Sequence, residues 1–215
     1  MTEAPGRDAL PQTRWERQVL AGHRGYGARF AELVAGGEDV EGEARLADAL
    51  APRGARILDA GSGMGRIGAA LRRAGHQAVG VDLDESLLEQ SRATYPDLPV
   101  AQARLEALGP AFFAAHGMPT AYDLVVCVGN VMVLLAEHSE RAVLRAFRDL
   151  LAADGRVLLG FSLTGAPPQS RVYAADEFAA DVAAAGLAIE SRFATFDLRP
   201  FDPEADFAVF VLVRA

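Results

Sequence analysis

Hydrophobic positions along the chain recur with two different periods. From Arg56 onward, short apolar runs alternate with amphipathic stretches whose apolar residues recur every three to four positions. Tyr122–Val128 is apolar on both faces, which is typical of a central strand in a parallel sheet. The apolar runs predict seven strands, at Ile57–Ala60, Ala78–Asp82, Pro99–Gln102, Tyr122–Val128, Arg156–Leu163, Leu187–Leu198 and Asp206–Arg214.

The amphipathic stretches predict helices. Only a proline-containing turn separates the last two strands, so these are expected to form an antiparallel pair. Between the other strands we expect four helices, at Arg66–Ala74, from the N-cap Asp84 through Ser91, from Ser139 to Gly155, and at Ala175–Ala185. Ahead of the first strand we expect three more, at Arg14–Leu20, Gly25–Val34 and Gly42–Leu50.

Alternation of strands and helices predicts the α/β fold class. Helices that connect parallel strands cover both faces of the sheet. We therefore expect a doubly wound seven-stranded sheet, mostly parallel with an antiparallel last strand. A chain of 215 residues fits one such domain, at residues 56–215, with residues 1–55 as an N-terminal helical cap or lid. Ligands of such sheets bind at the carboxyl ends of the strands, where the strand order reverses.

Composition and charge narrow the chemistry. All 21 basic residues are arginines, which excludes lysine Schiff bases and a phosphate-binding lysine. The single cysteine, Cys127, lies in an apolar strand and is expected to be buried and inert. The sequence lacks the His, Cys and Asp spacing of a metal site, so no metal is expected. The net charge of −8 argues against a nucleic acid partner. No apolar run reaches the about 20 residues of a membrane span, so we expect no membrane partner and a cytoplasmic protein.

A glycine-rich loop follows the first predicted strand. In Asp59-Ala60-Gly61-Ser62-Gly63-Met64-Gly65, three glycines at alternate positions allow a tight turn and a close approach of the backbone to a ligand. Asp59 ends an apolar strand, where a carboxylate is costly unless it meets a donor or a cation. Asp82 ends the second strand 21 residues after Gly61. At this spacing an acid accepts the ribose hydroxyls of a nucleoside ligand.

Taken together, these motifs resemble those of class I S-adenosylmethionine-dependent methyltransferases. The resemblance rests on Ile57–Gly65, Val79–Asp82 and Tyr122–Asn130, and it runs from about Arg56 to Ala215. It implies the Rossmann-like fold of that family, S-adenosylmethionine as the cofactor and S-adenosylhomocysteine as its product. Gly42–Arg45 and Phe193–Pro200 also resemble a bacterial subgroup of small-molecule type whose substrate is not assigned.

The resemblance also implies which residues hold the cofactor. Val128 and Asn130, after the fourth strand, would line the floor beneath the sulfonium. Asp59 would lie near the ammonium group of the methionine half. Ser62 stands where the family often has cysteine, a benign change. The candidate contacts to this half are Asp59, Gly61, Ser62, Gly63 and Gly65.

Candidate contacts to the adenosine half follow the second and third strands. Asp82 would hold the ribose, and Leu83 would pack on the adenine. After the third strand the family commonly carries an acid and then an apolar residue, and here the pair is Arg104-Leu105. Leu105 fits this pattern. Arg104 replaces the acid, so Glu106 is the alternative partner for the adenine amino group.

Methyl transfer itself needs little from side chains. The reaction is an in-line displacement whose leaving group departs neutral, and positioning alone contributes up to about 7–11 kcal/mol. Only an O–H or protonated N–H acceptor demands a general base. We therefore expect methyl transfer to O, N or C of a small-molecule acceptor, with no catalytic residue singled out. The four histidines, His23, His76, His116 and His138, are expected to be surface or structural residues.

Candidate residues that close the pocket lie in the N-terminal region, and two other functions stay open. Tyr26, Phe30 and Arg45 belong to the segment that often forms a lid in the resembling family. One alternative function is a non-catalytic S-adenosylmethionine-binding protein. The other is an NAD(P)-dependent oxidoreductase, because Gly63–Gly68 also matches Gly-x-Gly-x-x-Gly. Against it, Asp59 occupies a position where dehydrogenases carry an apolar residue. The sequence leaves the oligomeric state open.

Overall fold

Seven strands form one sheet, in the order β3-β2-β1-β4-β5-β7-β6. β7 runs antiparallel to its neighbours β5 and β6, and the other neighbouring pairs are parallel. The predicted mostly parallel sheet with an antiparallel last strand is confirmed. The strands are β1 (Arg56–Ala60), β2 (Gln77–Asp82), β3 (Val100–Gln102), β4 (Tyr122–Cys127), β5 (Leu151–Ser162), β6 (Leu187–Phe193) and β7 (Phe207–Arg214). The structure, a computed structural model, describes residues 11–22, 30, 32, 33, 35–202 and 204–215.

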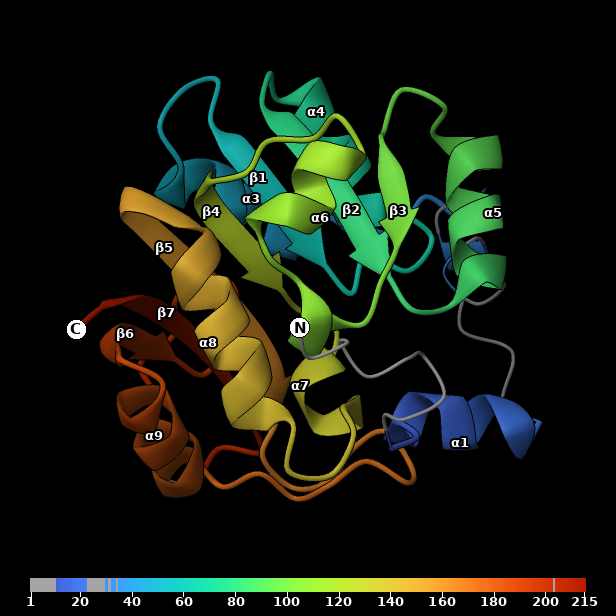
Figure 1. Cartoon of the computed structure of the whole chain (residues 1–215). Helices are drawn as coiled ribbons and strands as arrows, with labels where there is room; N and C mark the ends of the chain where they lie inside the picture. The colour runs from blue at the N-terminus through green and yellow to red at the C-terminus, as the bar shows by residue number, and fades with distance from the viewer. Residues whose placement is uncertain (1–10, 23–29, 31, 34, 203) are drawn as a thin grey trace, which may run out of the picture.

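Helices cover both faces of the sheet, as a Rossmann-like fold requires. In Figure 1, α6, α8 and α9 lie in front of the sheet, and α3 and α4 lie behind it. The 3₁₀ helix η2 spans Leu105–Ala107. The α-helices are α1 (Arg14–Leu20), α3 (Gly42–Leu50), α4 (Arg66–Arg73), α5 (Glu85–Thr94), α6 (Pro110–Ala115), α7 (Val131–Leu134), α8 (Glu140–Leu150) and α9 (Ala175–Ala184).

The end of α8 differs from the prediction. The helix ends at Leu150 and β5 begins at the next residue, so the expectation that Gly155 ends the helix was wrong. Gly155 lies inside β5, at the shift of register between β5 and β4. A Cβ there would stand 2.8 Å from the carbonyl oxygen of Tyr122. The glycine therefore permits a close approach of two strands.

Other differences concern short elements. β6 ends at Phe193 and not at Leu198, because the chain turns back and the Ala194 N–H donates to the Arg199 carbonyl at 2.9 Å. The helices α6 and α7 were not predicted, since six and four residues are too few to show a helical period. The helix expected at Gly25–Val34 lies largely outside the described residues.

β4 runs through the middle of the sheet and separates two hydrophobic clusters. Its side chains alternate between the faces. Val125 and Cys127 join the cluster beneath α6, α8 and α9, whereas Leu124 and Val126 join the cluster beneath α3 and α4. All four are fully buried. Burial raises the pKa of the Cys127 thiol, which keeps it protonated and unreactive, as expected.

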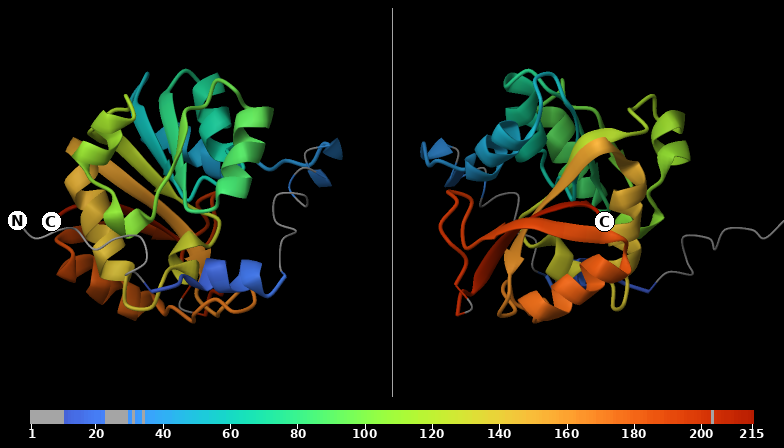
Figure 2. Two further views of the ribbon diagram at one scale, coloured as in Figure 1. Left: turned by 45° about the vertical axis from the view of Figure 1, so that its right-hand side comes forward. Right: turned by 90° about the vertical axis from the view of Figure 1, so that its left-hand side faces the viewer.

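α1 lies across the carboxyl-terminal edge of the sheet, beside α7 (Figures 1 and 2). It begins with a capping box, in which the Thr13 hydroxyl accepts from the Glu16 N–H and the Glu16 carboxylate accepts from the Thr13 N–H. The Arg14 N–H donates to the Leu135 carbonyl at 3.3 Å, and Thr13 forms a bridge with Ala136. α1 therefore lies where the predicted N-terminal cap would cover the edge of the sheet. The division into a cap and a domain at residue 55 stays a prediction.

Candidate functional site

The loop after β1 is built so that backbone, not side chains, faces the edge of the sheet. Gly61 has a φ of +81°, and a Cβ there would lie 2.5 Å from a methyl group of Val131. The Gly61 and Ser62 N–H groups both donate to the Val81 carbonyl on β2, at 2.8 and 3.0 Å. The Gly63 N–H donates to Asp82 Oδ2 at 2.8 Å. The loop is thus fixed against β2, next to the point between β1 and β4 where the strand order reverses.

Gly65 serves the packing of two helices. It is the N-cap of α4 with a φ of +84°, and a Cβ there would lie 2.2 Å from the Ser91 hydroxyl on α5. Such a contact leaves no room for a side chain. Gly65 does not line the cavity that opens beside this loop, so its predicted contact with the cofactor stays a prediction.

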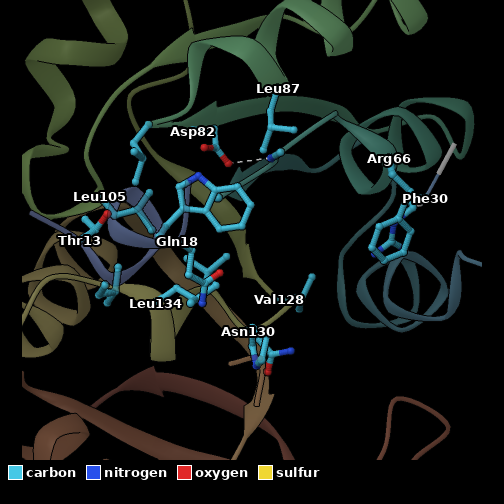
Figure 3. A pocket seen from close by; sticks show the side chains of 18 of the residues that line it. Thr13, Gln18, Phe30, Arg66, Asp82, Leu87, Leu105, Val128, Asn130 and Leu134 are labelled. Atoms are coloured by element: carbon cyan, nitrogen blue, oxygen red, sulfur yellow. Dashed lines mark hydrogen bonds between the residues drawn. The ribbon is translucent and has the colours of Figure 1, made fainter. Parts of the chain in front are cut away.

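A cavity of about 680 Å³ opens beside this loop, within the size range of small-molecule sites. In Figure 3, Thr13, Gln18 and Leu105 lie on one side, Phe30 and Arg66 lie together on the opposite side, and Val128 and Asn130 lie between them. Asp59 and Ser62 line a small neighbouring pocket that shares Gly61 and Val128 with the cavity. The predicted site residues that line the cavity itself are Gly61, Gly63, Asp82, Leu83, Leu105, Val128 and Asn130.

Two buried carboxylates stand at the ends of β1 and β2. Asp59 is 2% exposed and accepts the Gly68 N–H at 2.9 Å, and Asp82 is 9% exposed. Asp82 Oδ1 accepts the Asp84 N–H at 2.9 Å. Burial raises the pKa of Asp59 to about 7 and that of Asp82 to about 6, against the opposing effect of these N–H donors. Each carboxylate therefore gains from a ligand that brings positive charge or hydroxyl donors.

The segment after β3 joins the cavity to α1. Leu105 is buried and lines the cavity, as does Glu106. Arg104 does not line it. The Arg104 guanidinium donates to Glu106 at 2.8 Å and to Glu16 of α1 at 3.2 Å. The predicted contact of Arg104 with the cofactor therefore stays a prediction, and Glu106, the alternative partner for the adenine amino group, does line the cavity.

Asn130 is held rigidly after β4. It adopts the left-handed conformation with a φ of +70°, which asparagine tolerates better than most residues. Its Oδ1 accepts the Ser162 N–H at 2.8 Å, and its own N–H donates to the Gly160 carbonyl at 3.4 Å. β5 therefore orients the amide of Asn130 at the floor of the cavity.

The cavity also contains residues that the sequence prediction missed. Trp15 and Gln18 come from α1, Pro168 from the loop after β5, and Phe196 and Phe207 from the β6–β7 turn and strand. Trp15 and Gln18 lie three positions apart, the spacing of one helix face. That spacing is visible in the sequence and could have identified Trp15 and Gln18 as one face of a helix. The approach of the β6–β7 turn to the cavity depends on the order of the strands, which the sequence does not show locally.

Other candidates lie elsewhere. Arg45 is exposed and pairs with Asp39, the Arg45 Nη2–Asp39 Oδ2 distance being 2.7 Å, and it does not line the cavity. His76 is buried against Asp48 at 2.9 Å, while His116 and His138 are exposed. His23 and Tyr26 lie outside the described residues. Within the described residues, no helix is long and apolar enough to cross a membrane, and no cluster of His, Cys, Asp and Glu is arranged to hold a metal.

Comparisons with known proteins agree with this geometry. A family model described as a methyltransferase domain matches residues 57–155. The TehB-like SAM-dependent methyltransferase from Corynebacterium glutamicum is 36% identical, with a TM-score of 0.79, and the match covers 91% of this chain and 99% of that one.

More distant structures share the fold alone. The CcbJ methyltransferase from Streptomyces caelestis is 19% identical, with a TM-score of 0.70 over 81% of this chain and 89% of that one. The glycopeptide N-methyltransferase MtfA, in complex with S-adenosyl-L-methionine, is 14% identical, with a TM-score of 0.65 over 83% and 88%. No curated protein matches the chain.

Proposed function

The chain belongs to the S-adenosylmethionine-dependent methyltransferases, and from that premise we propose that it methylates a neutral amine nitrogen of a small, largely apolar acceptor. Family membership decides between hydride transfer and methyl transfer in favour of the latter. S-adenosylmethionine supplies an electrophilic methyl group on a sulfonium. The observation that carries the proposal is the lining of the cavity, which is mostly apolar and whose described residues offer an acceptor neither an uncommitted cation nor a typical base.

The described residues fit this cofactor. We assign Asp82 to the ribose hydroxyls, because a buried carboxylate with a raised pKa gains most from such donors. By the same argument, Asp59 faces the ammonium group. Leu83 and Leu105 offer apolar surface to the adenine, and Glu106 accepts from its amino group. Gly61 carries no side chain, since a Cβ there would collide with Val131, and the loop backbone is therefore accessible to the methionine half.

The acceptor end of the cavity is apolar. We assign to this end the apolar lining residues Leu134, Pro167, Phe196 and Phe207. Among the described lining residues, Arg66 is the one cation. Its guanidinium is bound to Glu43 by two hydrogen bonds of 2.9 Å. An anionic acceptor would therefore be buried without a counter-charge, which costs free energy. A neutral, apolar acceptor does not meet this cost.

The lining also bears on the acceptor atom. The described lining residues include no histidine, cysteine, tyrosine or lysine, and the carboxylate of Glu106 is paired with Arg104. An alcohol needs a base to lose its proton as it attacks. A neutral amine attacks through its lone pair and releases its proton afterwards to solvent. Orientation by packing is then sufficient for the reaction.

The experiment is a turnover assay with S-adenosylmethionine labelled in the methyl group. The panel contains small aromatic and alicyclic amines, each with matched compounds in which a hydroxyl, carboxylate or phosphate replaces the amine. We expect the labelled methyl group to be transferred to the amines alone. The rate should rise with pH as the amine loses its proton. Turnover confined to anionic compounds, or to alcohols, would contradict the proposal.

Two variants locate the acceptor in the cavity. Phe207→Ala removes apolar lining, so the KM for the acceptor should rise about five-fold or more while the affinity for S-adenosylhomocysteine stays within two-fold. Arg199→Ala is the control, because Arg199 lies in the turn between β6 and β7 that leads to Phe207 but is exposed and does not line the cavity. Equal effects of both variants would place the acceptor elsewhere.

A further inference from the structure

α1 forms one wall of the cofactor cavity. Thr13, Trp15 and Gln18 all line the cavity, while Arg17, on another face of the helix, is exposed and pairs with Glu137. Gln18 is buried and donates through Nε2 to the Pro168 carbonyl in the loop after β5. The helix therefore spans the cavity from the Thr13–Ala136 bridge to that loop.

Trp15 ties this wall to the turn that carries the ribose acid. Its indole Nε1 donates to Asp84 Oδ2 at 3.0 Å. The Asp84 N–H donates in turn to Asp82 Oδ1 at 2.9 Å, and Asp84 Oδ1 caps α5 by accepting the Ser86 N–H at 3.0 Å. Asp84 thus connects the indole of Trp15 to the carboxylate of Asp82, through one hydrogen bond on its side chain and one on its backbone N–H.

A second link joins α1 to the segment after β3. Arg104 Nη1 donates to Glu16 at 3.2 Å, and Nη2 donates to the Pro11 carbonyl at 2.7 Å. The same guanidinium holds Glu106, which lines the cavity. An arginine at this position, where the family commonly has an acid, thereby connects the N-terminal wall to the residues assigned to the adenine.

We propose that Trp15 is a cofactor-binding residue, whose indole covers the adenosine half of S-adenosylmethionine and whose bond to Asp84 keeps α1 closed over it. The indole lines the cavity together with Asp82, Leu83 and Leu105, the residues assigned to ribose and adenine. A flat aromatic surface beside an adenine contributes packing beyond simple burial. The bonds to Asp84 and Arg104 break when α1 leaves, so they slow release of the cofactor. The inference rests on family membership and is independent of the identity of the acceptor.

Fluorescence tests this directly, because Trp15 is the single tryptophan of the chain. We expect a saturable change in emission on titration with S-adenosylhomocysteine, and a change with adenosine alone but none with methionine alone. An emission unchanged at concentrations that saturate the site in calorimetry would overturn the assignment. A response to methionine but not to adenosine would overturn it too.

Variants separate the roles of ring and bond. Trp15→Ala should weaken S-adenosylhomocysteine binding about ten-fold or more in calorimetry, and Trp15→Phe, which keeps a ring, should weaken it less. Asp84→Asn keeps a cap for α5 but turns the acceptor of the Trp15 bond into a donor. It should raise the dissociation rate several-fold and leave the association rate almost unchanged.

Arg17→Ala is the matched control on α1, because its side chain faces away from the cavity and pairs at the surface. It should leave both rates within two-fold of the parent. Circular dichroism and the melting temperature of the unliganded variants identify any that fail to fold. A folded Trp15→Ala variant that binds S-adenosylhomocysteine as tightly as the parent would contradict the proposal.

Discussion

The carboxyl groups of Asp59 and Asp82 lie at places where a protein interior favours their neutral form. Burial raises both pKa values, and hydrogen bonds from the N–H groups of Gly68, Gly63 and Asp84 partly oppose that shift. The unliganded site therefore carries an electrostatic cost that a bound cation or hydroxyl donor relieves. This cost makes ligand affinity depend on pH.

The affinity for S-adenosylhomocysteine should rise with pH. The ligand favours the ionised carboxylates, so protons compete with it below the raised pKa values of about 6 for Asp82 and about 7 for Asp59. Calorimetry between pH 5 and pH 8 should show the Kd falling by up to about ten-fold per pH unit for each proton released, and levelling above about pH 7. Asp59→Asn should remove the upper part of this dependence. A Kd independent of pH in the parent would refute it.

The raised pKa of Asp59 also predicts that the stability of the unliganded protein falls with pH, whereas the affinity for the ligand rises. Between about pH 4 and pH 7 the unfolded chain has already lost the Asp59 proton while the folded protein keeps it, so this group destabilises the unliganded fold as pH rises. Asp59→Asn does not titrate. Its free energy of unfolding in urea, relative to the parent, should therefore increase from pH 4 to pH 7 and then stay constant. A difference that shrinks with pH would contradict the burial argument.

Asp82→Asn should abolish tight cofactor binding. One amide oxygen replaces two carboxylate oxygens that accept the Gly63 and Asp84 N–H groups, and the charge is lost. Hydrogen bonds to a charged group contribute about 1.5–3 kcal/mol, so we expect the Kd for S-adenosylhomocysteine to rise about 10- to 100-fold in calorimetry. Asp97→Asn, at an exposed acid, is the control and should have no effect. Equal Kd values for the two variants would remove the ribose assignment.

At the scale of elements, the acceptor end depends on how β5 meets the turn after β6. Phe196 packs against Gly160 of β5, where a Cβ would lie 2.4 Å from its ring. The ring of Phe196 also packs at 60° to that of Phe207, with centroids 5.8 Å apart. The absence of a side chain at one strand position therefore sets the position of an aromatic wall.

Gly160→Ala should change the acceptor site and spare the cofactor site. The new methyl group displaces the Phe196 ring, so the KM for the acceptor should rise about five-fold or more with the Kd for S-adenosylhomocysteine within two-fold. Steady-state kinetics and calorimetry measure the two. Gly109→Ala is the matched glycine control, because its Cβ would meet nothing within 4 Å. A loss of cofactor affinity in Gly160→Ala would show that the two ends of the cavity are coupled.

Glu140 joins three elements through buried charge. It begins α8, is 3% exposed, and lies 2.6 Å from Arg171 in the loop after β5 and 3.7 Å from Arg14 of α1. Glu140→Ala leaves both guanidinium groups without this partner. We expect a loss of about 2–4 kcal/mol in urea unfolding, below the full range for a buried pair because both arginines reach solvent. Glu137→Ala, in the exposed pair with Arg17, should cost at most about 1 kcal/mol. Equal losses would show that burial does not matter here.

The whole molecule couples cofactor binding to stability. The site combines the ends of β1, β2 and β4 with α1, so a ligand there favours the folded state. At a concentration 100 times its Kd, S-adenosylhomocysteine should add about 2.7 kcal/mol. For a chain of this size that raises the Tm by about 5–11 °C, measured by differential scanning fluorimetry. NAD is the control and should give no shift. A shift with NAD alone would contradict methyl transfer.

Local patterns in the sequence were sufficient for much of the fold and for the glycine loop and the two acids of the candidate site. The alternation of apolar runs and amphipathic stretches predicted all seven strands, because burial on both faces demands continuous apolar segments. The motif Asp59–Gly65 and the spacing to Asp82 predicted the loop and the acid that the structure joins by a hydrogen bond. The helix α7 escaped prediction because four residues are too few to show a helical period. The place of Gly155 within β5 escaped it because the close approach of two strands decides that position.

What the sequence by itself determined is the parallel sheet, its glycine loop and the carboxylates at its edge, since each depends on residues near one another in the chain. Only the tertiary structure decided what closes the cavity. Trp15 meets Asp84 across 69 positions, and Arg104 meets Glu16 across 88. Phe196 reaches Gly160 only because β7 lies between β5 and β6. These contacts depend on the order of strands and the path of α1, which no local period or motif encodes.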